Sequence, residues 1–341
     1  MNQAAIVSID LGKQSFHVVA HDKQGRELQR KKLSRSTYPK YFANLSPCTV
    51  AMEACGGAHF MAREMIRFGH EPKLIAPHHV RPYVKSNKND FADAEGICDA
   101  ASRGNMRFVA PKSEAQQALA MLNTVRDSFI KDRTATVNRI HAALLEVGIG
   151  LSASFKAIRE LPDLLENYSF CGLIKTLLMD LHSHFTYLDQ KVKTMDRQVA
   201  SQAADDDLAR RLMTIPCVGP ITATTVAAEL GDASQFKCGR DYSASIGLVP
   251  KQHSTGGKPV LLGISKRGDR NQRRLLIQCA RVYLITLDRQ TGELADWVRQ
   301  LLSRNHPNKV VCAVANKLAR IAYAIAAHHT EFDAGPSAMA A

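Results

Sequence analysis

Short apolar segments separated by turns dominate the beginning of the chain. Residues 4–10 form an apolar run that ends in an acid, and 15–20 form a second run; after a turn at 22–25, the more polar segment 27–33 is a candidate third strand paired back on the second. Apolar runs of this length bounded by turn residues are typical of strands. The pattern therefore predicts three strands that pair with one another in succession.

Strands then begin to alternate with helices. A buried strand at 49–53 precedes a helix through about residue 68, and a short strand at 73–76 precedes a helix over roughly 91–102. Three meandering strands followed by strand–helix alternation is the order of an RNase H-like α/β layer. We expect that fold for the N-terminal part.

Helical periodicity takes over at about residue 113. Apolar residues form one broad stripe over 113–147, and a second long helix is expected over 173–203. The apolar positions of that second helix are spaced by three and four residues in turn, which is a heptad pattern: Ile174, Leu178, Leu181, Phe185, Leu188, Val192, Met195 and Val199. The pattern fits either packing against the first helix or a dimerising coiled coil.

A third region follows the acidic break at 205–207. Its segment Ile215–Asp232 contains a Pro-x-x-Gly turn and a helix of small residues. This resembles a helix-hairpin-helix element, which presents backbone N–H groups to phosphates. Cys217 stands where a glycine is usual, and a plain helix start in a core is the alternative.

These patterns predict an α/β domain followed by α-helical parts. The expected divisions are an RNase H-like domain at 1–112, a long-helix segment at 113–207, a mainly helical domain at 208–330 and a tail at 331–341. Hydrophobic residues make up 45% of the chain, with no apolar run of 18 residues and no signal-peptide pattern at the start. We expect a cytoplasmic protein without a membrane span.

Basic residues are in excess. The net charge is +13 and the pI is about 9.4, which favours a polyanionic partner such as nucleic acid. Seven cations lie close together against the single acid Asp269: Lys251, Lys258, Lys266, Arg267, Arg270, Arg273 and Arg274. None of the eight cysteines forms a C-x-x-C pair, so neither a zinc ribbon nor a disulfide framework is indicated.

Four acids are candidates for a metal site. Asp10 and Glu53 each end an apolar strand, and Asp90 and Asp93 lie three residues apart on one face of a predicted helix. Crowded carboxylates repel one another unless Mg²⁺ or Mn²⁺ neutralises them. The alternative is that Asp90 is an N-cap and Asp93 an exposed helix charge; Glu95 and Asp99 face elsewhere.

A hydroxyl nucleophile is the second candidate. Ser254 and Thr255 precede Gly256 and Gly257 within the basic segment, where flexible backbone can approach a phosphate. A serine hydroxyl needs a base, a metal or a positive environment to act as a nucleophile. The alternative is a polar turn on a solvated basic face. Walker A and H-E-x-x-H patterns are absent from the sequence.

Five sequence motifs follow one another along the chain. They are SIDLGK, MEACGG, KSNKNDFADAE, IPCVGPITA, and GLVPKQHSTGG with GISKRGDRNQRR. Together they resemble the insertion-sequence transposases with a DEDD acidic site, the family that includes the Piv pilin-gene invertases and the bridge-RNA-guided serine recombinases. The resemblance covers nearly the whole chain.

The resemblance implies a RuvC-like N-terminal domain, a coiled-coil insert and a C-terminal transposase domain. It implies that Asp10, Glu53, Asp90 and Asp93 bind the metal and that a hydroxyl attacks DNA to form a covalent phosphoserine. Counting from the upstream string places the nucleophile at Thr255, and counting from the downstream string places it at Ser254; Ser254 is preferred because a primary hydroxyl is less hindered.

The resemblance also implies partners. These are the DNA of the element ends and target, a noncoding guide RNA, and further copies of the chain in a dimer or tetramer, in which one protomer supplies the acids and another the serine. We expect such a protein in the bacterial cytoplasm, associated with the nucleoid. Two other hypotheses remain: a RuvC-like junction nuclease that uses water, and a nucleic-acid-binding protein with a degenerate site.

Overall fold

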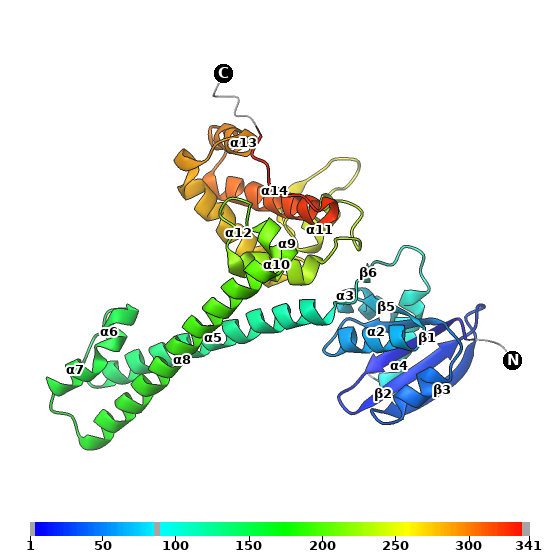
Figure 1. Cartoon of the computed structure of the whole chain (residues 1–341), viewed down its shortest axis with the longest axis horizontal. Helices are drawn as coiled ribbons and strands as arrows, with labels where there is room; N and C mark the ends of the chain where they lie inside the picture. The colour runs from blue at the N-terminus through cyan, green and yellow to red at the C-terminus, as the bar shows by residue number, and fades with distance from the viewer. Residues whose placement is uncertain (1–3, 85–88, 336–341) are drawn as a thin grey trace. The chain divides into compact units, whose positions relative to one another are not determined.

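The chain divides into two compact units. A computed structural model describes residues 4–84 and 89–335, and the units are Met1–Glu114 and Ala115–Ala341 (Figure 1). The first boundary lies within two residues of the one expected at 112. The long helices and the C-terminal helices belong to the same unit, and the further division of that unit stays a prediction.

The first unit is built on a six-stranded sheet in the order β3-β2-β1-β4-β5-β6. β1, β4 and β5 are parallel, β2 and β3 form an antiparallel meander, and β6 is antiparallel to β5. The strands are β1 Ile6–Leu11, β2 Ser15–His21, β3 Glu27–Ser34, β4 Thr49–Glu53, β5 Glu71–Ile75 and β6 Phe108–Val109. The predicted mixed α/β layer is confirmed; the sequence pattern does not predict β6.

Helices cover both faces of this sheet. Their bounds are α1 Tyr38–Ala43, α2 Ala58–Arg67, α3 Pro77–Val80, the 3-10 helix η1 Arg81–Tyr83, and α4 Asp90–Ala101. Val7 and Ile9 of β1 pack with α1 and α2 on one face. Ala51 of β4 and Ile75 of β5 pack with Ile97 of α4 on the other. Alternate residues of each strand therefore point to opposite helical layers.

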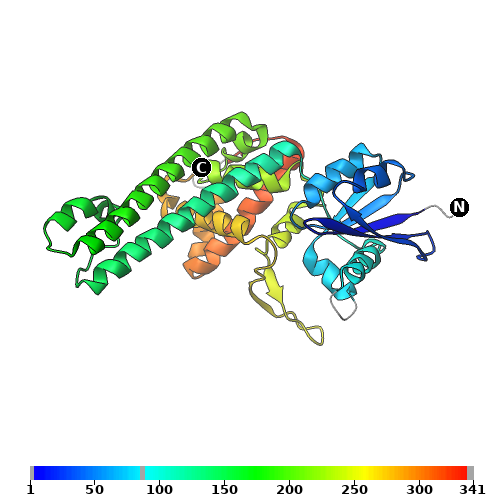
Figure 2. The same ribbon diagram turned by 90° about the horizontal axis from the view of Figure 1, so that it is seen from below.

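Two long helices begin the second unit. α5 Glu114–Glu146 and α8 Gly172–Asp205 lie side by side, with the short helices α6 Phe155–Arg159 and α7 Leu161–Glu166 between them in the chain (Figures 1 and 2). The buried heptad residues Leu178 and Phe185 of α8 pack against Ile140 and Leu144 of α5 and against α6 and α7. The heptad seam is therefore used within the chain.

A buried acid ties these helices together. The side chain of Asp189 on α8 is 8% exposed and pairs with Arg133 of α5 at 2.7 Å, Arg159 of α6 at 3.1 Å and Lys193 at 3.0 Å. Burial acts to raise the pKa of Asp189, but the hydrogen bonds from these cations outweigh it and lower the pKa. A buried carboxylate is stable here because the chain supplies its counter-charges.

The remaining helices form the largest apolar core of the described chain. Their bounds are α9 Asp207–Leu212, α10 Pro220–Leu230, α11 Gly239–Ser245, α12 Arg270–Ile285, the 3-10 helix η2 Leu287–Arg289, α13 Glu293–Leu302 and α14 Pro307–His328. Between α11 and α12, the strands β7 Pro250–Gln252 and β8 Leu261–Ile264 form an antiparallel hairpin. Figure 2 shows this hairpin projecting from the helices around it.

α14 is the one helix among the described residues that is long and apolar enough to cross a membrane. Half of its most apolar stretch is buried inside the unit, where Val314, Leu318 and Ala322 contribute to the core. Lys317 and Arg320 are exposed on the same helix. We therefore interpret α14 as a core helix with one charged side.

The turn between α9 and α10 contains a non-glycine residue in the left-handed region. Cys217 has φ 66°, at the position where the sequence pattern expects a glycine. A residue with a Cβ atom costs roughly 1–2 kcal/mol in this conformation, whereas glycine adopts it freely. The thiol makes a long contact of 3.8 Å with the Thr286 hydroxyl.

Cys217→Gly is expected to be more stable than Cys217→Ala by about 1 kcal/mol in free energy of unfolding, because both lose the thiol but only glycine removes the strain. Urea denaturation of the two variants measures this difference. Cys217→Val is the control. A β-branched residue is the least tolerated at positive φ, so this variant should be less stable than both the glycine and the alanine variants. Equal stability of the glycine and alanine variants would contradict the strain.

Candidate active site

The sheet face that carries α4 also carries three polar side chains at strand ends. Val7 and Ile9 point to the opposite face, so Asp10 points toward α4. Ile9 pairs with Met52 in the parallel ladder between β1 and β4, so the next residues, Asp10 and Glu53, lie side by side near the carboxyl ends of their strands. Two carboxylates are thus fixed at one edge by strand register.

His17 belongs to the same face. It is the direct cross-strand partner of Asp10 in the antiparallel pairing of β1 with β2, and it is 7% exposed. The sequence motifs alone do not mark His17 as a site residue. The register of the predicted hairpin could have identified His17. A hairpin that closes at 12–14 places Asp10 opposite His17, and residues paired across two strands share a face of the sheet.

The N-terminus of α4 supplies the other two acids. Asn89 is the N-cap, and its side chain accepts a hydrogen bond from the Phe91 N–H. Asp90 is therefore the first helical residue and not the cap, and Asp93 follows one turn later. Negative charge is stabilised at a helix N-terminus by the helix dipole. Part of the string KSNKNDFADAE, residues 85–88, lies outside the described residues.

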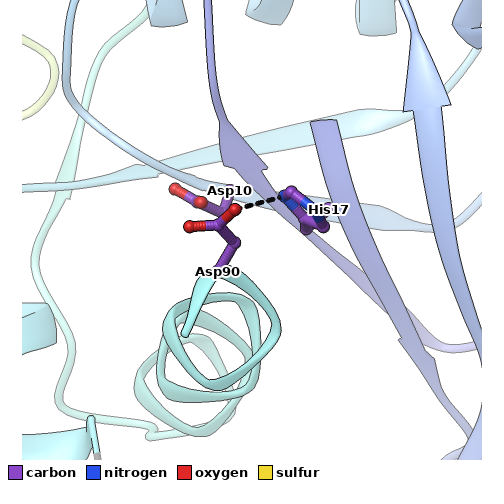
Figure 3. Close-up of side chains that lie close together, drawn as sticks. All are labelled: Asp10, His17 and Asp90. Atoms are coloured by element: carbon purple, nitrogen blue, oxygen red, sulfur yellow. Dashed lines mark ion pairs between the residues drawn. The ribbon is translucent and has the colours of Figure 1, made fainter. Parts of the chain in front are cut away.

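Figure 3 shows Asp10, His17 and Asp90 converging from β1, β2 and α4. One ligand atom from each lies within 4.8 Å of the others, and His17 Nδ1 is 3.4 Å from the Asp90 carboxylate. The Phe91 ring packs edge-on against His17 with centroids 4.7 Å apart. The imidazole is therefore held in place between a carboxylate and an aromatic ring.

The electrostatics join all four predicted acids in one cluster. The pKa of Asp10 is raised to about 6, mostly by burial and in addition by the charges of Asp93, Asp90 and Glu53, while His17 acts in the opposite direction. Burial and Asp93 also raise the pKa of Glu53, against the opposing charge of Arg81. Asp10 and Glu53 are therefore the two carboxyls whose ionisation the cluster makes costly.

The cluster fits a hard divalent cation. Carboxylate oxygens are the ligands that Mg²⁺ and Mn²⁺ prefer, and the carboxylates of this cluster lack the three neutralising cations that Asp189 has. Glu95 lies outside the cluster, because it pairs with Arg30 of β3. The chemistry of the donor set thus agrees with the predicted metal site, whose ligand roles stay a prediction.

Ser254 lies in the fully exposed connection between β7 and β8. Its Oγ accepts hydrogen bonds from Gln252 Nε2 at 2.9 Å and from the Val260 N–H at 3.3 Å. Both bonds leave the hydroxyl proton available. Thr255 pairs through its backbone with Lys258. Among the described residues, no base contacts either hydroxyl, so the hairpin holds Ser254 Oγ in place without activating it.

The cations predicted to contact nucleic acid divide into two groups. Lys251, Lys258, Lys266, Arg267 and Arg270 are exposed, and Arg274 is exposed with Asp127 at 3.5 Å. Arg273 differs from the expectation. It is 9% exposed, and its guanidinium donates to the carbonyls of Ile246 and Arg267, both at 2.8 Å.

Arg273 thereby joins the two ends of the hairpin segment, because Ile246 precedes β7 and Arg267 follows β8. The same place requires glycines: a Cβ on Gly247 would lie 2.3 Å from the Arg267 carbonyl oxygen, and one on Gly268 1.6 Å from that of Ser245. A buried guanidinium with backbone acceptors is unsuited to contact phosphate. We therefore interpret Arg273 as the residue that fixes the base of the Ser254 hairpin.

The six-stranded mixed sheet with helices on both faces and the acidic cluster at one edge define the class of the first unit: a mixed α/β domain with an acidic site. Residues 7–149 match the DEDD transposase model of the IS110 group, described as Transposase, and residues 209–295 match the model of the Transposase IS116/IS110/IS902 family.

Curated relatives extend the match over the whole chain. The transposase for insertion sequence element IS1328 of Yersinia enterocolitica is 49% identical, over 97% of this chain and 99% of that protein. A probable family 20 transposase of Pseudomonas aeruginosa is 40% identical over 96% of this chain and 98% of its own length. The transposase for IS1111A of Coxiella burnetii is 38% identical over 98% and 93%. The chain belongs to the IS116/IS110/IS902 transposase family.

Metal binding and pH are expected to be linked through Asp10. Because its pKa is raised to about 6, the folded protein binds this proton more tightly than the unfolded chain. The contribution of Asp10 to metal-free stability therefore decreases as pH rises from about 4 to about 6. A divalent cation binds the ionised form, so Mn²⁺ should raise the unfolding temperature more at about pH 7.5 than at about pH 5.

Thermal unfolding with and without Mn²⁺ at the two pH values measures this effect. Asp10→Asn should abolish the Mn²⁺-induced rise, whereas Glu95→Gln, a change on the same domain outside the cluster, should preserve it. A rise of equal size at both pH values, or one that persists in Asp10→Asn, would show that the cation binds elsewhere.

Proposed function

We propose that this transposase cleaves and joins DNA through a covalent phosphoserine at Ser254, with Mg²⁺ or Mn²⁺ bound by Asp10, Glu53, Asp90 and Asp93. The observation that carries the proposal is the pairing of two features in one family member: a cluster of four acids with a raised Asp10 pKa, and an exposed serine held in the connection of a basic hairpin.

The exchange conserves the number of phosphoester bonds. Ser254 Oγ forms a bond to phosphorus as the bond to one deoxyribose oxygen breaks, and that oxygen takes up a proton and leaves as a free hydroxyl. A hydroxyl of another strand then attacks the phosphoserine and releases the serine. No external energy source is needed, because each step exchanges one ester for another.

The residues of the chain divide the work. Gln252 and the Val260 N–H orient Ser254 Oγ, and Lys251 and Lys258 raise the local positive potential for the phosphate. A bound divalent cation supplies stabilisation of the charge that develops on the phosphoryl oxygens. An imidazole is a poorer ligand than a carboxylate for Mg²⁺. We therefore assign His17 the role of orienting Asp90 through their contact, and not that of a metal ligand.

Ser254 needs a proton acceptor that its own hairpin lacks. The acidic cluster contains carboxylates, and a carboxylate within hydrogen-bond reach can accept the serine proton. We infer that the acids of one protomer act with the serine of another, so that the active enzyme is a dimer or tetramer.

The family resemblance and the net charge of +13 support a role for RNA. We infer that a noncoding RNA from the same element guides the protein to the DNA of the element ends and the target. Such an enzyme works in the bacterial cytoplasm, in contact with the nucleoid.

A metal-dependent junction nuclease that uses water is the second candidate. The raised pKa of Asp10 favours it equally, because the acidic cluster alone is sufficient for hydrolysis. The two candidates differ in their products: hydrolysis leaves free ends, whereas the serine route leaves protein attached to DNA. A merely DNA-binding role is disfavoured, since it would not retain four acids in mutual repulsion.

Ser254→Ala is expected to bind DNA normally but to form no covalent adduct, with strand exchange reduced on the order of 10⁴-fold or more, as on loss of a covalent nucleophile. Thr255→Ala, the neighbouring hydroxyl variant, should retain most activity. Denaturing electrophoresis of labelled, cut DNA measures the adduct as a shifted band that protease removes.

Mass spectrometry of the trapped adduct identifies the modified residue. A phosphoester on Thr255 would overturn the assignment to Ser254. Cleaved DNA without any adduct would favour the nuclease that uses water.

A further inference from the structure

A basic cavity lies between α11 and α14 in the second unit, and none of the hairpin cations lines it. Its volume is about 490 Å³. We call it the α11–α14 groove; it is lined by Cys238, Gly239, Arg240, Lys317, Arg320, Ile321, Tyr323 and Ala324. No acidic residue is among these lining residues.

Three cations converge on the groove from two helices. Lys317 and Arg320 lie three residues apart on the exposed side of α14, and Arg240 faces them from α11. All three side chains are exposed, and within the described chain none of them has an ion-pair partner. Three like charges around one cavity repel one another, so an anion with several charges is the ligand that this arrangement favours.

The walls of the groove are held rigidly. A Cβ on Gly239 would lie 3.2 Å from the backbone of Arg320, a tighter contact than most side chains make, so glycine favours the close approach of α11 to α14. The Tyr323 hydroxyl donates to the Phe236 carbonyl at 3.1 Å, which ties α14 to the segment before α11. The spacing between Arg240 and the two cations of α14 is therefore set before a ligand binds.

The groove is also connected to the Ser254 hairpin. Asn316, next to Lys317, donates from its Nδ2 to the Ser243 hydroxyl at 2.6 Å and to the Leu248 carbonyl at 3.2 Å. Leu248 lies two residues before β7. A ligand held by Lys317 thus has a fixed relation to the base of the hairpin that carries the nucleophile.

We propose that the α11–α14 groove binds backbone phosphates of duplex DNA, as a phosphate site separate from the hairpin cations. The inference rests on the proposed function only in taking DNA as the substrate. Guanidinium and ammonium groups in open grooves are the usual partners of phosphodiesters. Because Asn316 connects the groove to the base of the Ser254 hairpin, a DNA strand bound in the groove is held in a fixed position relative to that hairpin.

Neutralising these cations should reduce both affinity and its salt dependence. Each phosphate contact adds about 0.9 to the slope of log affinity against log salt concentration for duplex DNA. The variants K317Q, R320Q and R240Q should therefore each lower the slope by about 0.9. Filter binding of the full chain to a labelled DNA duplex, from about 50 to about 200 mM salt, measures it.

Two controls separate a specific site from a change in net charge. The double variant R240K/R320K keeps the charges and should keep the slope of the parent protein. Lys175→Gln removes one exposed charge from α8 and should change the slope by much less than K317Q. Circular dichroism of each variant checks folding, which these exposed positions should not affect.

Unchanged slopes in all three variants would overturn the proposal, as would slopes that decrease with an RNA duplex but not with DNA. The groove and the serine mechanism are tested separately. The salt slope reports on the groove, whereas the covalent adduct reports on Ser254, and Ser254→Ala should remove the adduct without altering the slope. A lowered slope in K317Q together with a normal adduct on Ser254 supports the groove as a binding site on its own.

Discussion

The cost of placing four carboxylates together governs the first unit. Asp10 and Glu53 end parallel strands that are neighbours in the sheet, and α4 brings Asp90 and Asp93 to the same edge. Asp189 in the second unit shows the contrast. It is buried too, but three cations of the chain surround it and its pKa is lowered, whereas the pKa of Asp10 is raised to about 6. The charges of His17 and Arg81 oppose the raised pKa values of Asp10 and Glu53 without reversing them, and we propose that a divalent cation supplies the remaining compensation.

Other features of the first unit maintain this arrangement. Asn89 caps α4 and fixes where its first turn begins. Gly96 allows α4 to approach the segment after η1, because a Cβ there would lie 2.8 Å from the Val84 side chain. His17, held between Asp90 and Phe91, limits the motion of the carboxylate. In the second unit, Arg273, Gly247 and Gly268 perform the corresponding task for the Ser254 hairpin.

Much of the fold follows from local pattern. Alternation of apolar residues in β1, β2 and β4 identifies the strands and the face on which Asp10 and Glu53 lie, and helical spacing identifies α5 and α8 within two residues at each end. These signals suffice because burial on one face leaves a periodic trace in the sequence. Local pattern also marks Cys217 as a residue in a place for glycine, which its φ of 66° confirms.

The features that escaped prediction depend on contacts between distant segments. His17 became a site residue through strand register, and Arg273 lies in a run of exposed cations that does not reveal its burial. The α11–α14 groove brings together Arg240 and Lys317, which lie far apart in the sequence. The heptad seam of α8 fits two partners equally well by spacing, and only the packing of α5, α6 and α7 against it determines which one is used.

The central claim is that the four acids bind one divalent-metal centre. Anomalous diffraction from crystals of the protein soaked in Mn²⁺ tests it directly, because the scattering locates the ion without reference to activity. The account predicts a peak bounded by carboxylate oxygens of Asp10, Glu53, Asp90 and Asp93. Full occupancy of Mn²⁺ at another site, with these carboxylates free of metal, would contradict it.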